Sequence, residues 1–286
     1  MSQTRSGRSQ ATAIIPHSRC PGPKLRAFKH QDAEIEWGRR LDGDRAGVAE
    51  TDGYVFEVKI RSRLYALKVF KFFHPHSTMY YWGVYLGTPI PLKKVIYYTD
   101  PFFAECRAYG RIEEASEKLG RKDQLAVKCH GYIYLGDEDK KKLQEKGLDL
   151  GMNVLDEKLR QALEGGGRVR AIVKDLAPSR TSVNSRNVRA ALETVRKLNE
   201  LQIYNRDIRA ENFVGGKLVD FGSSWTEPHI ILDALEPDEA EDSRLEDLVM
   251  FDDMIEEEGI KTRPQVQALR NVEYRKKLRG RQVPKG

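Results

Sequence analysis

The chain has 286 residues, of which 40% are hydrophobic and 32% are charged, and its formal net charge is +6. This composition is ordinary for a soluble protein with a substantial core, and the sequence contains neither a run of about 18 apolar residues nor a signal-peptide pattern, so a membrane protein is excluded. The three cysteines are widely spaced without metal-ligand spacing, which favours free thiols and an intracellular, reducing location.

The N-terminal part of the chain combines a polar tail with a hairpin pattern. Residues 1–30 are rich in Ser, Arg, Pro and Lys and poor in apolar residues, so we expect a disordered basic tail. Apolar and polar residues then alternate over 54–60 and again over 64–70, with a turn at 61–63 between them. This alternation predicts an antiparallel hairpin, with Lys68 in its second strand.

Aromatic residues and prolines crowd the next segment, 71–99, and we expect them to pack a local core rather than to form a partner surface. Asp100 followed by Pro101 predicts the start of a helix, because Asp caps helix N-termini and Pro fits the first helical position. The apolar stripe extends this helix to about residue 119. Glu105 lies next to the stripe in the first turns, where it either turns inward toward Lys68 or remains a solvated carboxylate.

Two further strands are predicted over 126–134 and 168–174, with a charged, helix-prone segment over 137–164 between them. Residues 174–178 are expected to form a hinge between lobes, where an adenine would hydrogen-bond to the backbone. The apolar spacing over 187–201 predicts a helix that leads directly into a polar loop beginning at Asn205.

The C-terminal part of the chain separates its charges, since residues 236–258 are strongly acidic and residues 261–286 are strongly basic. These segments predict either two solvated helix faces or an acidic helix packed on a basic one. The functional alternative is that the basic segment contacts nucleic acid or an acidic partner, or acts in nuclear import. Without interleaved aromatics or a recognisable DNA-reading module, we do not expect direct nucleic-acid binding.

The most specific pattern is a set of polar residues in a fixed order. Lys68 follows Ala66 and Leu67 in a strand, Asp207 precedes Asn212 by five positions, and Asp220 begins an Asp-Phe-Gly string. Each fragment alone is usually structural, as a snorkelling lysine or a turn. Their joint occurrence predicts a phosphoryl-transfer site of the protein-kinase type.

Phosphoryl transfer requires cations and a positioned acceptor, because the transferred group spreads its charge over several oxygens. Lys68 is expected to bind the α- and β-phosphates of ATP and to pair with Glu105. Asp220 and Asn212 are the expected Mg²⁺ ligands. Asp207 is the expected base for the acceptor hydroxyl, and Arg209 would place positive charge near the γ-phosphate. The expected nucleotide-binding set is completed by Gly53, Val55 and Ala66.

Together these elements predict an α+β, protein-kinase-like fold with two lobes. The N-lobe would cover 31–178, with an antiparallel sheet and the aromatic insertion at 71–99. A reduced helical C-lobe over 179–260 would contain the catalytic loop, and a basic segment, 261–286, would end the chain.

Three stretches of the sequence resemble the Fta-two family, subunits of the fungal Sim-four kinetochore complex. They are the hairpin strings at 54–56 and 65–68, the string at 101–111, and the block from Asn205 to Gly222, with residues 105–111 the most distinctive. The resemblance covers roughly residues 30–230. It implies a kinase-like fold, an inner-kinetochore or otherwise nuclear location, and partners among kinetochore or chromatin proteins. The sequence itself leaves a cytoplasmic location open as the alternative.

The sequence also departs from the kinase pattern. Counting back from Gly53, Val48 and Glu50 stand where a phosphate-covering loop would have glycines, which would keep backbone amides away from phosphates. Asn205 replaces the usual histidine before Arg206, which predicts weaker support for the catalytic loop without removing the base. The chain ends 64 residues after Gly222 without an Ala-Pro-Glu string, so we expect the peptide-docking half of the large lobe to be reduced or absent.

These observations leave three functions open. The first is an active phosphotransferase acting on a hydroxyl acceptor, favoured by the survival of all the charged positions together. The second is a catalytically weak pseudokinase scaffold of a kinetochore or chromatin complex, favoured by the poor glycine loop. The third is a small-molecule kinase of the aminoglycoside or choline type, which Arg206 disfavours. The hydroxyls of Ser223, Ser224 and Thr226 belong either to phosphorylation sites or to a polar loop.

Overall fold

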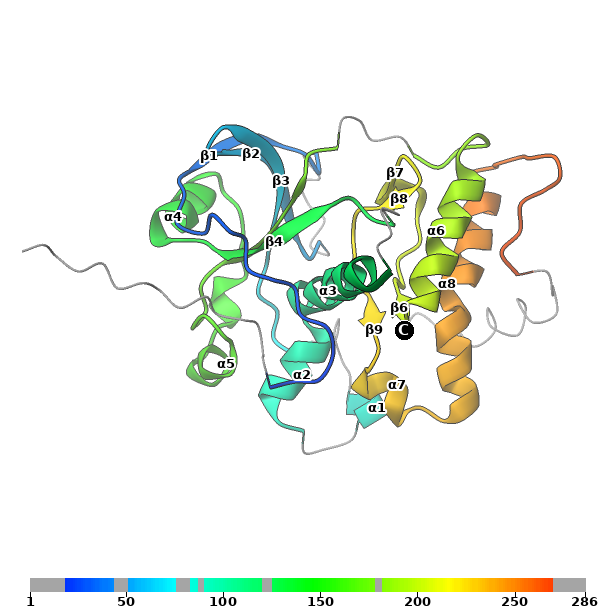
Figure 1. Ribbon diagram of the computed structural model, residues 1–286. Helices are drawn as coiled ribbons and strands as arrows, with labels where there is room; N and C mark the ends of the chain where they lie inside the picture. Colours follow the sequence, from blue (N-terminus) through cyan, green and yellow to red (C-terminus); the bar gives the residue numbers. More distant parts are fainter. Residues whose placement is uncertain are drawn as a thin grey trace, which may run out of the picture.

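The computed structural model describes residues 19–43, 51–75, 83–86, 90–119, 125–177 and 182–269. A five-stranded antiparallel sheet in the order β1-β2-β3-β5-β4 is its largest element (Figure 1). Its strands are β1 Ile35–Arg40, β2 Gly53–Ile60, β3 Arg63–Phe70, β4 Cys129–Tyr134 and β5 Arg170–Asp175. The predicted α+β class is confirmed, whereas the kinase-like division into two lobes stays a prediction.

Helices flank both faces of the sheet. Figure 1 shows α3 between the sheet and the neighbouring helices α6 and α8, with α4 on the other side of the strands. The helices are α1 Gly83–Leu86, α2 Leu92–Thr99, α3 Pro101–Leu119, α4 Asp137–Glu145, α5 Glu157–Ala162, α6 Val188–Glu200, α7 Ile230–Ala234 and α8 Pro237–Glu257. Two short two-stranded antiparallel sheets complete the architecture: β6 Ile203–Tyr204 with β9 Trp225–Thr226, and β7 Phe213–Val214 with β8 Lys217–Leu218.

The predicted hairpin is confirmed, with β2 and β3 paired from Gly53 opposite Phe70 to Ile60 opposite Arg63. Because side chains alternate along a strand, one face of the hairpin is apolar, and its side chains join Leu143 of α4 in a core. The other face carries Lys68 and is turned toward α3. The register of this hairpin therefore determines on which side of the sheet the lysine lies.

Helix α3 begins where the sequence predicts. Asp100 Oδ1 accepts a hydrogen bond of 2.9 Å from the backbone N–H of Phe102, which satisfies one of the donors left open at a helix N-terminus. Asp100 Oδ2 also pairs at 2.8 Å with Arg170 of β5, whose side chain is almost completely buried. This buried ion pair ties the start of α3 to the sheet and helps to fix the direction of the helix.

A continuous apolar core connects the inner face of the sheet with α3, α6 and α8. The aromatic segment 71–99 contributes Phe72, Tyr97 and Tyr98, which are buried as the local-core interpretation requires. Tyr80, Tyr81 and Trp82, which belong to the same expectation, lie outside the described residues.

The expected boundary of the N-terminal tail is wrong, because residues 19–30 pack against the fold. Leu25 and Phe28 are only 1% exposed, and Phe28 donates a 2.8 Å hydrogen bond to the carbonyl of Tyr132 in β4. The close approach depends on Gly131, which has a φ of +122° and where a Cβ would come within 2.6 Å of the Arg26 carbonyl oxygen. Average composition missed this contact because a few buried apolar residues suffice to anchor a polar segment. Residues 1–18 lie outside the described part of the chain.

Three other expectations need correction. In the basic segment, residues 261–269 contain no helix, and the acidic helix α8 packs on α6. Positions 270–286 are outside the described residues, so a basic helix there stays untested. Lys174 and Asp175 belong to β5 rather than to a hinge, and of the expected hinge only 176–177 follow the strand before residues 178–181, which are not described. The strand expected over 126–134 begins at Cys129, and β1 was not predicted.

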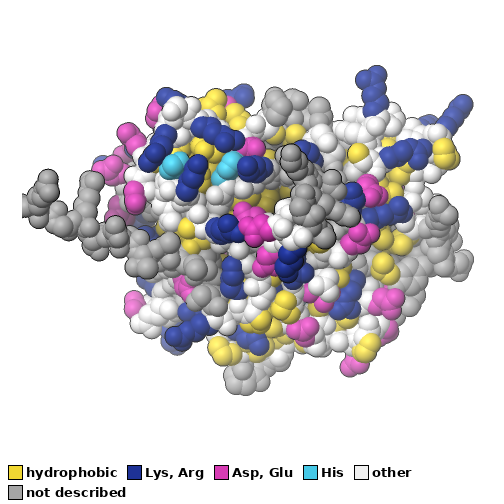
Figure 2. All heavy atoms as spheres, viewed as in Figure 1, with side chains coloured by type: hydrophobic (Ala, Val, Ile, Leu, Met, Phe, Trp, Pro, Cys, Tyr) yellow, Lys and Arg dark blue, Asp and Glu magenta, His cyan; other side chains and the backbone are white. Residues whose placement is uncertain are grey.

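On the face shown in Figure 2, basic and acidic side chains are interspersed, and Lys, Arg and His side chains gather over the strands at the upper left. Among the described residues, the large apolar side chains that are exposed are Leu64 and Tyr85. Within the same residues, the structure contains no helix with the length and apolarity needed to span a bilayer.

Candidate functional site

Three carboxylates surround the side chain of Lys68. Its Nζ lies 2.7 Å from Asp220 Oδ1, 2.9 Å from Asp52 Oδ2 and 3.1 Å from Glu105 Oε2. The lysine side chain is 3% exposed and that of Glu105 is completely buried. The structure therefore brings together three of the residues selected from the sequence, Lys68, Glu105 and Asp220, from positions up to 152 apart in the chain.

Strand register explains how the lysine reaches this position. Val55 of β2 and Ile172 of β5 lie directly opposite Lys68 in the ladders, so all three side chains are on the face toward α3. Ala66 is on the same face, two residues before the lysine. The expected nucleotide-binding residues Val55 and Ala66 thus share a surface with Lys68, and both are half-buried.

A second lysine, Lys174, belongs to the same cluster and was missed by the sequence analysis. Its Nζ contacts Glu105 Oε1 and donates a 2.7 Å hydrogen bond to the carbonyl of Val219, and the residue is 6% exposed. Lys174 is opposite Ala66 in the ladder, which places it on the face of Lys68. Only the pairing of β3 with β5 reveals this position, because the sequence offers no register between strands so far apart.

Asp52 was also missed, since it stands beside the loop that lacks the expected glycines. Its carboxylate approaches Gly222 so closely that a Cβ there would lie 2.0 Å from Asp52 Oδ2. The next residue, Gly53, cannot carry a side chain without a backbone shift, because a Cβ at that position would lie 2.1 Å from the carbonyl oxygen of Val69. Val48 and Glu50 lie outside the described residues.

The cluster changes the pKa values of its members. Burial alone would lower the pKa of Lys68, but Asp220, Asp52 and Glu105 raise it well above its usual range. Burial would raise the pKa of Asp220, and Lys68 followed by Lys174 outweighs this effect and holds that pKa well below its ordinary value. Burial raises the pKa of Asp52 to about 6 against the attraction of Lys68. Lys68 and Asp220 are therefore charged at neutral pH.

The loop that begins at Asn205 is held from both sides. Asn205 Nδ2 donates a 2.7 Å hydrogen bond to the carbonyl of Asp220. The carboxylate of Asp247, on α8, accepts 2.7 Å hydrogen bonds from the backbone N–H groups of Asn205 and Arg206. Arg206 has a φ of +62°, which is a strained conformation for a residue with a side chain and is stabilised by these contacts. Asn205 thus connects the two loops directly, although its replacement of histidine predicted weaker support.

Burial raises the pKa of Asp247 to about 6, while the two backbone N–H groups act in the opposite direction. The sequence analysis treated the segment 236–258 as uniformly acidic, either solvated or packed on a basic helix, and therefore missed this residue. The signal that distinguishes Asp247 is its position within the apolar stripe of α8, between Ala240 and Phe251, which are both buried.

The expected base, Asp207, is held by two side chains of its own loop. Arg209 donates from Nη2 to Asp207 Oδ2 at 2.7 Å, and its Nε lies 2.6 Å from Oδ1. Asn212 Nδ2 donates to Asp207 Oδ2 at 2.9 Å. The structure brings these three predicted residues together, and it places the Arg209 guanidinium on the carboxylate of Asp207.

Arg206 and the hydroxyl residues that follow Gly222 are already engaged. Arg206 pairs with Glu246 at 2.5 Å and stacks on Trp225 with its guanidinium carbon 3.7 Å from the ring centre. Ser224 and Thr226 are buried, at 2% and 0% exposure. Both are thus inaccessible to a kinase in this conformation, which favours the polar-loop interpretation for these two residues.

Helix α3 holds the segment after Gly222 with two arginines. Arg107 Nη2 donates to the carbonyls of Thr226 and Pro228, the second at 2.5 Å, and Nη1 donates to the carbonyl of Pro21 at 3.2 Å. Arg111 donates to the carbonyls of Leu201, at 3.0 Å, and Glu227. The distinctive string 105–111 therefore has a physical explanation, because one helix supplies both the cluster carboxylate and the contacts that fix the neighbouring chain.

Asp220 and Asn212 fit the chemistry of a Mg²⁺ site, since both offer hard oxygen ligands. Their loops are joined where the Val219 N–H donates a 3.0 Å hydrogen bond to the Asn212 carbonyl. The described residues contain no group of three or more His, Cys, Asp or Glu arranged to hold a metal ion. Mg²⁺ is usually held in proteins by one or two carboxylates together with substrate phosphates and water.

Comparison with known proteins gives one family. The model of the family described as "Kinetochore Sim4 complex subunit FTA2" matches residues 13–225. No curated protein matches the chain. Among solved structures, "Structure of vaccinia related kinase 3" is similar over 73% of this chain with 13% sequence identity and a TM-score of 0.35. The aligned part spans only 53% of that kinase structure's chain.

Proposed function

Because the chain belongs to the family of the kinetochore Sim4 complex subunit FTA2, we propose that it is a kinetochore subunit containing a kinase-like domain that binds ATP with Mg²⁺. A two-lobed arrangement, with the nucleotide between the sheet and the loops at 205–212 and 220–222, is part of this proposal. The domain would transfer a phosphoryl group to a hydroxyl acceptor. The family also implies protein partners and a nuclear location.

The observation that carries the proposal is the position of Lys68 between Glu105 and Asp220, at 3.1 Å and 2.7 Å. A buried lysine between two carboxylates from a helix and a distant loop is more than packing requires, because burying charges costs free energy unless they are well paired. An anchored lysine of this kind binds phosphate oxygens without moving. A role in binding the phosphate groups of a nucleotide would explain why the protein buries these charges despite the free energy that their burial requires.

The remaining residues have roles that follow from their contacts. Asp220 and Asn212 would hold Mg²⁺, which when bound would neutralise phosphate charge. Asp207 would accept the proton of the acceptor hydroxyl, with Arg209 and Asn212 orienting its carboxylate. Asp247 would keep the loop in place through the backbone N–H groups of Asn205 and Arg206.

The test is a thermal-shift titration of the purified protein with ATP, with and without Mg²⁺. A ligand that binds only the folded form stabilises it by about 2.7 kcal/mol at a hundredfold excess over its dissociation constant, so even weak binding is measurable. We expect a Mg²⁺-dependent shift that Asp220→Asn abolishes and that Asp137→Asn, an exposed aspartate on α4, leaves unchanged. Production of ADP that depends on Asp207 would then show cleavage of the γ-phosphoryl bond, and phosphate on a hydroxyl acceptor rather than free phosphate would establish transfer.

A specific observation favours a second function, a pseudokinase scaffold. Asp52 occupies a hydrogen-bonding position on Lys68 that a phosphate would need, at 2.9 Å. If the protein shows no shift at millimolar ATP with Mg²⁺, the phosphotransferase proposal fails and the carboxylate cluster is a structural element of a scaffold. The family membership is independent of this outcome.

A further inference from the structure

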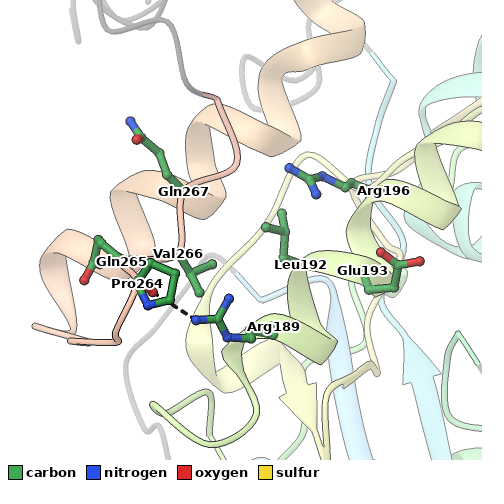
Figure 3. Close-up of a pocket in the computed structure, with 8 residues that line it drawn as sticks. All are labelled: Arg189, Leu192, Glu193, Arg196, Pro264, Gln265, Val266 and Gln267. Atoms are coloured by element: carbon green, nitrogen blue, oxygen red, sulfur yellow. Dashed lines mark hydrogen bonds between the residues drawn. The ribbon is translucent and has the colours of Figure 1, made fainter.

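A groove on the surface lies between helix α6 and the segment 264–267, away from the lysine cluster. Figure 3 shows the residues that line this cavity of about 550 Å³: Arg189, Leu192, Glu193, Arg196, Pro264, Gln265, Val266 and Gln267. Its volume lies within the usual range for ligand-binding cavities. The residues on α6 are spaced by three or four positions and therefore form one face of the helix.

Two arginines stand at the ends of this face. Arg189 donates a 2.9 Å hydrogen bond to the carbonyl of Pro264, and Arg196 donates to the carbonyl of Ala268 at 3.3 Å. In Figure 3 both guanidiniums extend from α6 toward the segment that follows Pro264, with Leu192 between them. Each guanidinium has five N–H donors and is held in place by the contact with the backbone, so the other donors are presented in an ordered geometry.

The segment opposite α6 is fixed rather than loosely attached. The carboxylate of Asp252, a buried residue of α8, accepts hydrogen bonds from the backbone N–H groups of Ala268 and Leu269 at 2.6 Å and 3.0 Å. Val266 and Leu192 are 7% and 6% exposed and form an apolar floor between the arginines. The groove is therefore a preformed surface with a positive charge at each end and an apolar centre.

We propose that this groove binds an extended acidic segment of a partner protein. Residues seven positions apart on a helix are separated by about 10 Å along its axis. In the polyproline II conformation, which has three residues per turn and rises about 3.1 Å per residue, side chains three positions apart lie on the same face and are about 9 Å apart. Two carboxylates with this spacing would meet Arg189 and Arg196 in the bidentate geometry that guanidinium favours, while a residue between them packs on Leu192 and Val266.

Charge complementarity favours a peptide over a nucleic acid. Glu193 lies on the same wall between the two arginines, so a continuous polyanion would meet a like charge in the middle of the groove. Glu193 also pairs with Lys197 at 3.6 Å, which reduces its effect on a ligand whose negative charges are confined to the two ends. The apolar floor has no counterpart in a phosphate backbone but suits an apolar side chain.

The experiment uses the full chain and a fluorescent eight-residue peptide with two aspartates three positions apart and a leucine between them. Fluorescence anisotropy should show saturable binding, about tenfold weaker or more for the same peptide with asparagines in place of the aspartates. Arg196→Gln should weaken binding by a similar factor. Arg39→Gln, on β1, removes a charge of the same kind from another exposed arginine and should leave the affinity unchanged.

Equal melting temperatures of Arg196→Gln and Arg39→Gln would show that any difference in peptide affinity comes from binding and not from folding. Arg189→Gln provides a second test at the other end of the groove. Three results would overturn the proposal: no saturable binding up to about 1 mM peptide, equal binding of the asparagine peptide, or an equal loss in Arg39→Gln. Displacement of the peptide by an equal concentration of inorganic phosphate or of duplex DNA would instead assign the groove to a free anion or to nucleic acid. The peptide-binding measurement contains no ATP and changes no residue of the lysine cluster, so its result is independent of the proposed nucleotide site.

Discussion

Asp52 Oδ2 lies 2.9 Å from the Nζ of Lys68, on the same ammonium group that Asp220 and Glu105 contact. The aspartate comes from the residue directly before β2 rather than from the loop at 220–222 or from α3. Lys68 is thus fully paired by protein groups, and a phosphate has to replace at least one of them.

Removal of this carboxylate should strengthen nucleotide binding. In Asp52→Asn the group that competes with phosphate for Lys68 loses its charge, so we expect ATP affinity to rise about tenfold, which corresponds to about 1.4 kcal/mol. Isothermal titration with ATP and Mg²⁺ measures this. Asp137→Asn removes the same charge at a distance and should have no effect. An unchanged affinity in Asp52→Asn would show that Asp52 does not compete with the nucleotide.

Lys174 should stabilise the fold through Glu105. Lys174→Met leaves a completely buried carboxylate with one cation fewer, and breaking a buried pair in this way costs about 3 kcal/mol of unfolding free energy. Urea denaturation measures the loss, and Lys128→Met, an exposed lysine just before β4, serves as control. The double variant with Glu105→Gln should lose less than the sum of the single variants by about 1 kcal/mol or more. Additive losses would mean that the two residues do not interact.

Arg107 should hold two distant segments on α3. Its guanidinium donates to carbonyls of Pro21, Thr226 and Pro228 and lies over the rings of Tyr97 and Tyr98. In Arg107→Met these three carbonyls lose a donor that is almost completely buried, so we expect a destabilisation of about 2–4 kcal/mol. Hydrogen exchange should increase in both 19–28 and 225–229, but not in Arg39→Met. An increase confined to one segment would contradict a shared anchor.

Asp247 should give stability a defined pH dependence. Burial raises its pKa to about 6 from an ordinary value of 3.8, so between about pH 4 and pH 6 the folded protein binds more protons than the unfolded chain at this group. The free energy of unfolding contributed by Asp247 therefore falls as pH rises through this interval. Asp52 acts in the same direction over the same interval. Asp220 acts in the opposite direction below about pH 4, because its pKa is lowered.

Urea denaturation at pH 4, 5, 6 and 7 tests this dependence. Asp247→Asn should flatten the fall between pH 4 and 6 and lower stability at each pH by about 1–3 kcal/mol, because one of the two N–H groups at Asn205 and Arg206 loses its acceptor. Glu257→Gln, at the exposed end of α8, should leave the slope as it is in the parent protein. A variant with the parental slope would show that Asp247 does not carry a raised pKa.

Local signals in the sequence were sufficient for several elements. The alternation over 54–70 gave the hairpin, Asp100 with Pro101 gave the start of α3, and apolar spacing gave α6, because each of these depends on residues that are neighbours in the chain. The order of Lys68, Glu105 and Asp220 also assigned these residues to one predicted site, in which Lys68 was expected to pair with Glu105. Their proposed roles toward a nucleotide stay predictions.

The chain itself determined which chemistry-bearing residues exist and in which order, since spacing within a strand, helix or loop is a local property. Only the tertiary structure decided which of the remaining charges join them. Asp52 and Lys174 resemble ordinary surface residues in the sequence, and Asp247 differs from them only by its place in the apolar stripe of α8. Lys174 and Asp247 are buried and Asp52 is half-buried because strand register and the packing of α8 bring them to Glu105, Asn205 and Lys68. Contacts between residues far apart in the chain depend on register and burial, which no local pattern encodes.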